Sequence, residues 1–190
     1  MRFKYQGHIL RPIEGTGPSP EPPTPSFDQV QIGNQIWMSK NLAIDDGGEG
    51  ISTKTVNYGQ GDVVEYYYTW AAAVRVAESV QGWHLPTSSE LDALVSYVGG
   101  TSVAGTKLKS TYGWANNGNG TDEFGFTALP AGYYDTSHGM FGEYAYFWSS
   151  TSHTYDESLA YRGALSYGKK VRVDSTYKTQ AGSVRLIKDS

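Results

Sequence analysis

The chain has 190 residues, a formal net charge of −4 at pH 7 and no cysteine. This acidic balance gives no basic surface for nucleic acid or for an anionic membrane, so neither is expected as a partner. The lack of cysteine excludes thiol nucleophiles, cysteine-ligated metals and disulfides. With 15 tyrosines, 5 tryptophans, 23 glycines and only 18% charged residues, the composition is typical of a loop-rich β or α+β domain.

The N-terminal part is rich in proline, because six of the eight prolines lie between Pro12 and Pro25. Such a segment cannot hold a helix or a central strand, so we expect an extended, semi-rigid spacer. We therefore predict a tail and linker over residues 1–26 and one folded domain over residues 27–190. No apolar run is long enough to span a membrane, so direct membrane insertion is not expected. Residues 1–10 also lack a signal-peptide core, so a leader or lipid anchor for export is not expected in this chain.

The first predicted elements are a hairpin and two helices. Residues 30–37 (VQIGNQIW) predict a β-hairpin, because the central Gly-Asn pair suits a two-residue turn. The run TWAAAVRVAESV, which begins at Thr69, combines an N-cap candidate with strong helix formers and predicts a short amphipathic helix. In PTSSELDALVSYVGG, Thr87 and Glu90 form a capping box before apolar residues at helical spacing, which predicts a second helix.

The second half of the chain changes to strand-like pieces. These are FGFTALPAGYY, YAYFWSST, SLAYRGAL, KKVRVDS and SVRLIKD. Gly, Ser, Asn and Asp separate them, as is typical of turns. Helices early and strands late predict an α+β domain with an antiparallel sheet.

Six blocks occur in an order that carries a family resemblance. They are IGNQIWMSKNLA, YYYTWAAA, GWHLPTSSELDAL, FGFTALPAGYY, YFWSST and SVRLIKD. Over roughly residues 27–189, the chain resembles the Fibrobacter succinogenes major paralogous domain family of bacterial surface and secreted proteins. The WHLPT block and the closing patterns are also similar to a wider group with a C-type lectin-like fold. This group includes formylglycine-generating enzymes and the variable proteins of diversity-generating retroelements.

The resemblance implies a C-type lectin-like fold of the α+β class. Two helices would pack on a small twisted antiparallel sheet, with long loops presented on one face. The family often has one cysteine just before the GW block and another near the end, where this chain has residues 78–80 and Leu186. This departure implies a lost disulfide rather than a lost activity. Formylglycine generation depends on cysteine in its family, so it is excluded for this chain.

Large aromatic side chains are expected to anchor the core, because they supply much of the apolar area that a loop-rich domain can bury. The candidates are Trp83, Trp114 and Trp148. Arg185 lies in an otherwise apolar strand, which leaves two alternatives open. It could pair with a partly buried acid, Glu90 or Asp92, or lie on an edge strand in water.

A serine, histidine and aspartate neighbourhood raises the hypothesis of a hydrolase. Its members are Ser150, Ser152, His153 and Asp156. A catalytic triad is a spatial arrangement, so neighbours in sequence have no special claim to form one. Adjacent residues on a strand also point to opposite faces, and the chain lacks a G-x-S-x-G elbow. We therefore expect a polar loop here and no enzyme activity.

One loop contains oxygen-bearing side chains that could surround a calcium ion. Within WANNGNGTDEFG these weak candidates are Asn117, Asn119, Asp122 and Glu123. None of the tripeptides with which sugar-binding C-type lectins hold calcium occurs in the chain. The favoured interpretation is a turn-forming loop whose side chains bond their own backbone. No metal or other cofactor is expected, and calcium remains the alternative.

The segment between YFWSS and SVRLIKD alternates small apolar with large polar or aromatic residues. The predicted inward residues are Ala160, Ala164, Val171 and Val173, and the predicted outward ones are Tyr161, Arg162, Tyr167, Lys170 and Tyr177. Tyrosines flanked by Ser and Gly are typical of recognition surfaces, because tyrosine gives wide contact at small entropy cost. For any single tyrosine, a half-buried structural role is the alternative. The candidate ligand-binding residues are His153, Tyr155, Asp156, Tyr161, Arg162, Tyr167, Lys170 and Tyr177.

Together these features predict a non-catalytic binding or adhesion module, secreted or on the cell surface. Its tyrosine-rich face would span residues 152–180, and its partner would be an extracellular protein or glycan. One alternative is a subunit of a surface appendage of the pilus-tip type, in which residues 4–10 (KYQGHIL) add a strand to a neighbour. Another is a retroelement-diversified receptor, since the variable positions of those relatives occupy the equivalent stretch.

Overall fold

The structure is a computed structural model that describes residues 26–190. The predicted linker and strand-forming tail fall on residues 1–25, outside the described part. The described helices are α1 (Trp70–Glu78), α2 (Ser88–Tyr97) and α3 (Ala104–Leu108). The described strands are β1 (Gln29–Ile32), β2 (Gln35–Met38), β3 (Ile51–Asn57), β4 (Asp62–Tyr68), β5 (Trp83–His84), β6 (Tyr133–Tyr134), β7 (His138–Gly139), β8 (Tyr144–Ser152), β9 (Leu159–Ser166), β10 (Val171–Tyr177) and β11 (Ile187–Lys188).

The local signals for the hairpin and both helices are confirmed. Strands β1 and β2 pair antiparallel, and Gly33 in the two-residue turn has φ of 63°, which glycine adopts at little cost. Helix α1 begins after Thr69, whose side chain accepts a hydrogen bond from the backbone of Ala72. Helix α2 begins with the complete capping box of Thr87 and Glu90. Short helix α3 was not predicted.

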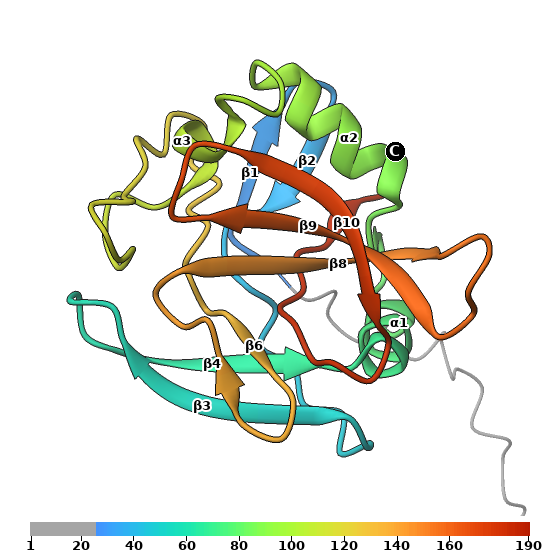
Figure 1. Cartoon of the computed structure of the whole chain (residues 1–190). Coiled ribbons are helices and arrows are strands. Elements are labelled where there is room, and N and C mark those ends of the chain that lie inside the picture. The colour runs from blue at the N-terminus through green and yellow to red at the C-terminus, as the bar shows by residue number, and fades with distance from the viewer. Residues whose placement is uncertain (1–25) are drawn as a thin grey trace, which may run out of the picture.

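The strands form several small antiparallel sheets, so the domain is of the mixed α+β class. The largest has the order β1-β2-β11-β5, and a second has the order β10-β9-β8. Figure 1 shows the second sheet across the middle of the molecule, with the β3–β4 hairpin below it and α2 above it. The chain around Gly182 bridges the two regions, because Ser183 pairs with Phe147 of β8 and Gly182 pairs with Tyr68 of β4.

Two large hydrophobic clusters form the core. The first joins α2 and α3 to the inner side of β8 and β9, and includes Trp37 and Trp114. The second joins α1 to β4, β5 and β8, and includes Trp83 and Trp148. The three predicted tryptophan anchors are therefore confirmed as buried. The indole N–H of Trp148 donates to the carbonyl of Tyr68 at 2.8 Å, which satisfies the polar atom inside the core.

Two of the predicted strands are mostly irregular. Of FGFTALPAGYY, only its last two residues form a strand, β6. Of SVRLIKD, only Ile187–Lys188 does so, as β11. The reason is that this last segment serves several elements in turn. The carbonyl of Ser183 accepts from Trp148 of β8, whereas the carbonyls of Val184 and Leu186 accept from Leu42 and Met38, so no single partner strand runs along it.

Arg185 occupies neither of its two predicted environments. It is fully buried, which excludes the edge position in water. Its hydrogen bonds go to Asn41 and to the backbone carbonyls of Met38, Phe126 and Thr127, rather than to Glu90 or Asp92. The prediction failed because these acceptors lie about 60 to 150 positions away in sequence, where no local pattern reaches.

The predicted inward residues of the segment 160–173 do face the core, but not from one side of the sheet. Ala160, Ala164 and Val171 are buried, and Val173 packs against the core. Val173 pairs directly with Gly163, so both valines lie on the face opposite that of the two alanines. Both faces of this sheet are partly covered: Leu91 of α2 approaches Gly163 on one side, and Ala160 joins the Trp148 cluster on the other.

Candidate binding surface

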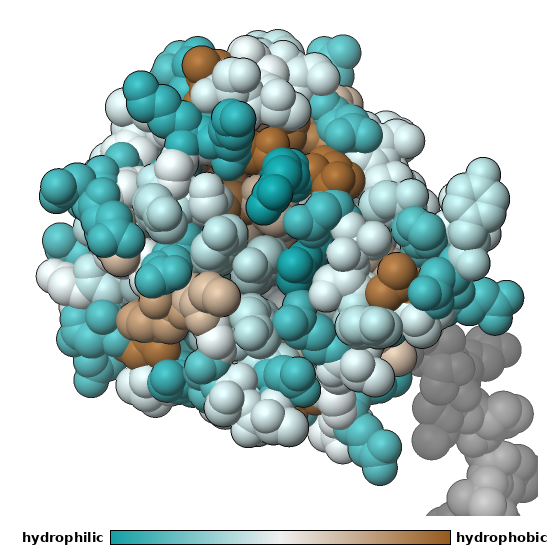
Figure 2. Space-filling model, viewed as in Figure 1, coloured by the Kyte–Doolittle hydropathy of each residue, from teal (hydrophilic) through white to brown (hydrophobic). Residues whose placement is uncertain are grey.

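The predicted ligand-binding residues lie on β9, on β10, on the turn between them and on the connection from β8 to β9. This connection covers residues 153–158 and projects from the right-hand edge of the molecule in Figure 1 and Figure 2. The structure divides the eight candidates into three separate groups. Four of them form what we call the loop-end cluster, consisting of His153, Tyr155, Tyr161 and Tyr177.

The loop-end cluster is a set of neighbouring rings at the end of the sheet. The His153 ring lies 5.4 Å from the ring of Tyr161 and 6.3 Å from that of Tyr155, measured between centroids. Tyr177 lies on the same face, diagonal to Tyr161 in the β9–β10 ladder. Tyr155 is 93% exposed and Tyr177 is 64% exposed. Exposure of this degree leaves both rings free for contact with a ligand.

Two contacts shape the loop that carries this cluster. Asp156 Oδ1 accepts from the backbone N–H of Ser158 at 2.9 Å and from its hydroxyl at 2.6 Å. These hydrogen bonds hold the pKa of Asp156 below its ordinary value, so the carboxylate stays charged. At the other end of the loop, Lys178 Nζ donates to Ser152 Oγ at 2.7 Å. Asp156 therefore has a role in loop shape.

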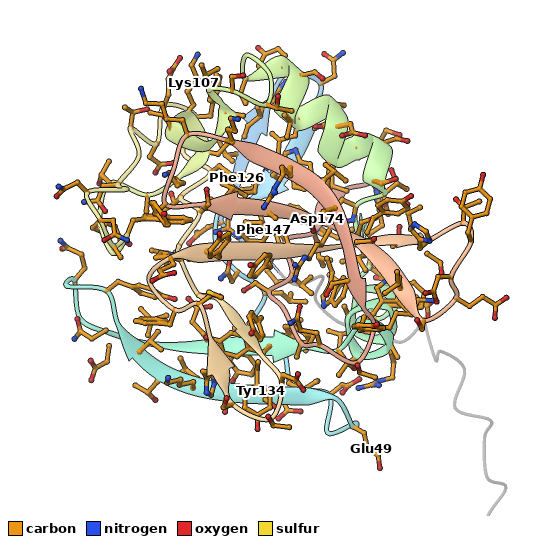
Figure 3. The ribbon with its side chains drawn as sticks, viewed as in Figure 1. Glu49, Lys107, Phe126, Tyr134, Phe147 and Asp174 are labelled. Atoms are coloured by element: carbon orange, nitrogen blue, oxygen red, sulfur yellow. The ribbon has the colours of Figure 1, made fainter. Side chains whose placement is uncertain are left out.

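Arg162 lies on the opposite face of the sheet from the loop-end cluster. Its guanidinium donates to Asp174 at 3.0 Å and to Gln180 at 2.7 Å. The same group lies over the ring of Tyr146, 3.8 Å from its centroid. Figure 3 labels Asp174 on β10, above the β8 strand that carries Phe147. With its side chain only 13% exposed, Arg162 stabilises this face rather than presenting a free cation.

Tyr167 and Lys170 lie at the far end of the hairpin. The six steps from Tyr161 to Tyr167 span roughly 20 Å along an extended strand. The turn is fixed from below by Lys109, whose ammonium donates to the carbonyls of three consecutive residues at 2.7 to 3.1 Å. Burial lowers the pKa of Lys109 to about 8. One ligand of modest size could not contact both ends of the hairpin.

The chain matches the Fibrobacter succinogenes major domain over residues 30–188. It belongs to this family. No curated protein and no solved structure is significantly similar to it. None of the helices in residues 26–190 is both long enough and apolar enough to cross a membrane.

Within this Fibrobacter succinogenes major domain, the sequence blocks that carry the family resemblance form much of the frame. Trp37, Trp83, Trp148 and Arg185 all come from these blocks, and all are buried. The loop-end cluster lies on the chain between the YFWSST and SVRLIKD blocks. The domain thus separates a buried frame from an exposed aromatic cluster.

The serine and histidine residues of the hydrolase hypothesis are engaged elsewhere. Ser150 bonds the carbonyl of Pro86, through its backbone N–H at 2.8 Å and its hydroxyl at 3.4 Å. Ser152 accepts from Lys178, and His153 Nδ1 accepts from the backbone of Tyr155 at 3.4 Å. These contacts give no serine a histidine base, so they provide no support for a nucleophile.

The weak calcium candidates are also occupied by contacts within the chain. Asn119 caps the backbone N–H of Trp114, and Asp122 accepts two hydrogen bonds from Thr127. Glu123 pairs with Lys107 at 3.3 Å, while Asn117 adopts a left-handed backbone conformation with φ of 56°. Among residues 26–190, no group of three or more His, Asp or Glu side chains could hold a metal ion. The loop has the self-bonding character expected of a turn.

Two residues beside the loop-end cluster were missed by sequence reasoning. Lys178 lies 4.1 Å from the ring centroid of Trp70, whose indole N–H donates to the carbonyl of Ser149 at 2.9 Å. Trp70 is the first residue of α1 and lies far from the cluster in sequence. In the sequence, only the position of Lys178 directly after Tyr177 hinted at its place beside the cluster, and this position does not indicate that the lysine lies over Trp70.

Proposed function

We propose that this chain is a non-catalytic binding or adhesion module with a C-type lectin-like scaffold. It acts outside the cell or on its surface, where the loop-end cluster contacts an extracellular protein or glycan. The observation that carries the proposal is the 93% exposure of Tyr155 beside the ring of His153, which also neighbours the ring of Tyr161. Exposed, positioned aromatic rings supply large contact area at a low cost in entropy.

The supporting contacts favour a preorganised surface. Asp156 and Ser158 fix the turn, and Lys178 joins the end of β8 to the residue after β10. A loop held in its binding conformation loses less entropy when a ligand arrives, so more of the contact energy appears as affinity. This argument concerns position and exposure, and it requires no catalytic group.

The two alternatives have less support. Assembly into a surface appendage would depend on residues 4–10, which lie outside the described part of the chain. Diversification by a retroelement would act on the same segment that carries the loop-end cluster, so it is compatible with the proposed surface. A template repeat with adenine-rich codons beside the gene would favour that receptor.

A triple variant tests the proposed surface on glycan and protein arrays. Tyr155→Ala, Tyr161→Ala and Tyr177→Ala together should lower the array signal for the natural ligand by about tenfold or more, because aromatic anchors dominate most interfaces. The matched control is Tyr97→Ala, which removes a 60% exposed tyrosine from α2. The control should bind like the unmodified chain. Full binding by the triple variant would exclude the loop-end cluster as the contact surface.

A further inference from the structure

A second site is suggested by a pocket of about 490 Å³ that shares no residue with the loop-end cluster. It lies between β4, the chain that follows β2 and the chain that precedes β6. Its volume is within the range of roughly 300–1,000 Å³ that is typical of small-molecule sites. Six residues matter for the argument: Asn41, Leu42, Val64, Glu65, Leu129 and Arg185.

The pocket has a carboxylate at its base. Glu65 is 2% exposed, and it accepts from Tyr58 Oη at 3.0 Å and from Asn41 Nδ2 at 2.9 Å. Burial, followed by the charge of Glu65, raises the pKa of Tyr58 far above its ordinary value, so this hydroxyl remains a donor. A carboxylate accepts up to about four hydrogen bonds. These two donors therefore leave acceptor capacity for a ligand.

The charge of Glu65 is already balanced. Asn41 also accepts from Arg185 Nε at 2.8 Å, so one amide bridges the carboxylate and the guanidinium. Lys40 at the rim is held by Asp28 at 2.6 Å. A cationic ligand would bring a second positive charge close to Arg185, and an anionic ligand would face Glu65. The charges favour a neutral ligand that carries hydroxyl donors.

The rest of the lining is largely apolar. Leu42 and Leu129 form part of the wall, and Val63 and Val64 lie at the exposed part of β4. Figure 2 shows an apolar patch near the left end of β4 and the connection that leads into β8. A ligand suited to this pocket combines a C–H surface with a hydroxylated edge. A saccharide ring has both features.

We propose that this pocket binds a neutral saccharide unit. Its hydroxyls donate to Glu65, and its C–H surface packs on Leu42 and Val64. The inference does not rest on the proposed function of the loop-end cluster, because it uses different residues and a different kind of contact. A chain could carry either site without the other.

The test is an amide NMR titration with glucose, galactose, mannose and cellobiose as neutral probes. At least one should shift the amides of residues 41–43 and 63–65, whereas glucosamine and glucuronate should bind at least tenfold more weakly. Glu65→Gln should weaken binding by about tenfold or more, because it removes a charged acceptor. Val64→Trp leaves the buried carboxylate unaltered and should also weaken binding, because a bulky ring at this exposed position obstructs the pocket.

The matched control is Val103→Trp, which places the same ring at an exposed valine of another region and should leave binding unchanged. Several outcomes would overturn the proposal. These are no shift with any neutral sugar, shifts confined to the loop-end cluster, equal binding of the charged analogues, and unchanged binding in Val64→Trp. The triple tyrosine variant should retain the shifts, so failure of one site is distinguishable from failure of the other.

Discussion

Arg185 shows how a single residue can organise several distant segments. Its guanidinium is fully buried beside the rings of Phe126 and Phe147, whose centroids lie 4.8 and 5.4 Å from it. Figure 3 labels these two rings near the centre of the molecule. Burial lowers the pKa of Arg185 to about 9, so the side chain remains charged at neutral pH. Four hydrogen bonds compensate for the lost water.

Arg185→Met should therefore lower the free energy of unfolding by about 3–5 kcal/mol, because it leaves Glu65 without its positive partner and three carbonyls without a donor. Arg185→Lys should recover only part of this loss, since one ammonium cannot reach all four acceptors. Urea denaturation measures both effects. Arg75→Met removes an exposed pair with Asp46 and should change stability little. Equal stability of Arg185→Met and the unmodified chain would contradict this account.

At the scale of elements, His84 joins three parts of the fold. It lies on β5, and its ring bonds Glu90 of α2 at 3.0 Å and Asp189 after β11 at 2.6 Å. Burial opposes the charge on the ring, but the two carboxylates outweigh it and raise the pKa of His84 above 6.5. Burial also opposes the charge on Glu90, but its hydrogen bonds with Thr87 and His84 outweigh burial and lower the pKa of Glu90 below 4.5.

The resulting contribution to stability should depend on pH. The raised pKa of His84 gives a contribution that is complete below pH 6.5 and is lost as the pH rises through the folded-state pKa. The lowered pKa of Glu90 gives a second contribution to stability, which is complete above pH 4.5 and is lost as the pH falls through the folded-state pKa. Urea denaturation across this range should show the alkaline decline in the unmodified chain and in His138→Gln. A decline of the same size in His84→Gln would exclude His84 as its source.

Helices were easier to predict than strands because their signals are local. Thr69 and Thr87 cap their helices within a few residues of sequence, so a single window contains the whole signal. The β3–β4 hairpin was missed although DVVEYYY is rich in strand-forming residues. In β4 the usual polarity is inverted, because Val64 is exposed while Glu65 is buried. A hydrophobic pattern cannot indicate the inner face of such a strand.

The candidate site shows the same limit. Sequence reasoning found the tyrosines of the loop-end cluster, because composition and flanking residues are visible along the chain. It placed Arg162 outward together with Tyr161, although neighbouring residues of β9 face opposite sides of the sheet. It also missed Trp70, whose place beside Lys178 results from the packing of α1 under the sheet. Long-range packing, rather than local preference, determines these neighbours.

At the scale of the whole molecule, residues 181–187 connect the two core clusters. Leu186 packs in the cluster around Trp148, and Ile187 packs in the cluster around Trp37. Upstream, Ala181 and Gly182 bridge to Tyr134 and Tyr68. The domain therefore cannot complete either cluster until this late segment is in place.

Removal of residues 181–190 should consequently unfold the domain. The segment buries three aliphatic side chains, Val184, Leu186 and Ile187. Each contributes about 1.5–3 kcal/mol, and Arg185 is lost as well, so the total approaches the 5–15 kcal/mol that stabilises a typical domain. Near-ultraviolet circular dichroism should show that chain 1–180 lacks fixed tertiary structure, while chain 1–189 retains it.

Fragment complementation distinguishes loss of this segment from general damage by truncation. A synthetic peptide of residues 181–190 should restore tertiary structure to chain 1–180, because it resupplies the strand pairing and both sets of core contacts. The same peptide with Leu186→Asp should fail, since it would place a charge inside the cluster around Trp148. Folded structure in chain 1–180 alone would show that the two clusters form independently of the segment that lies between them.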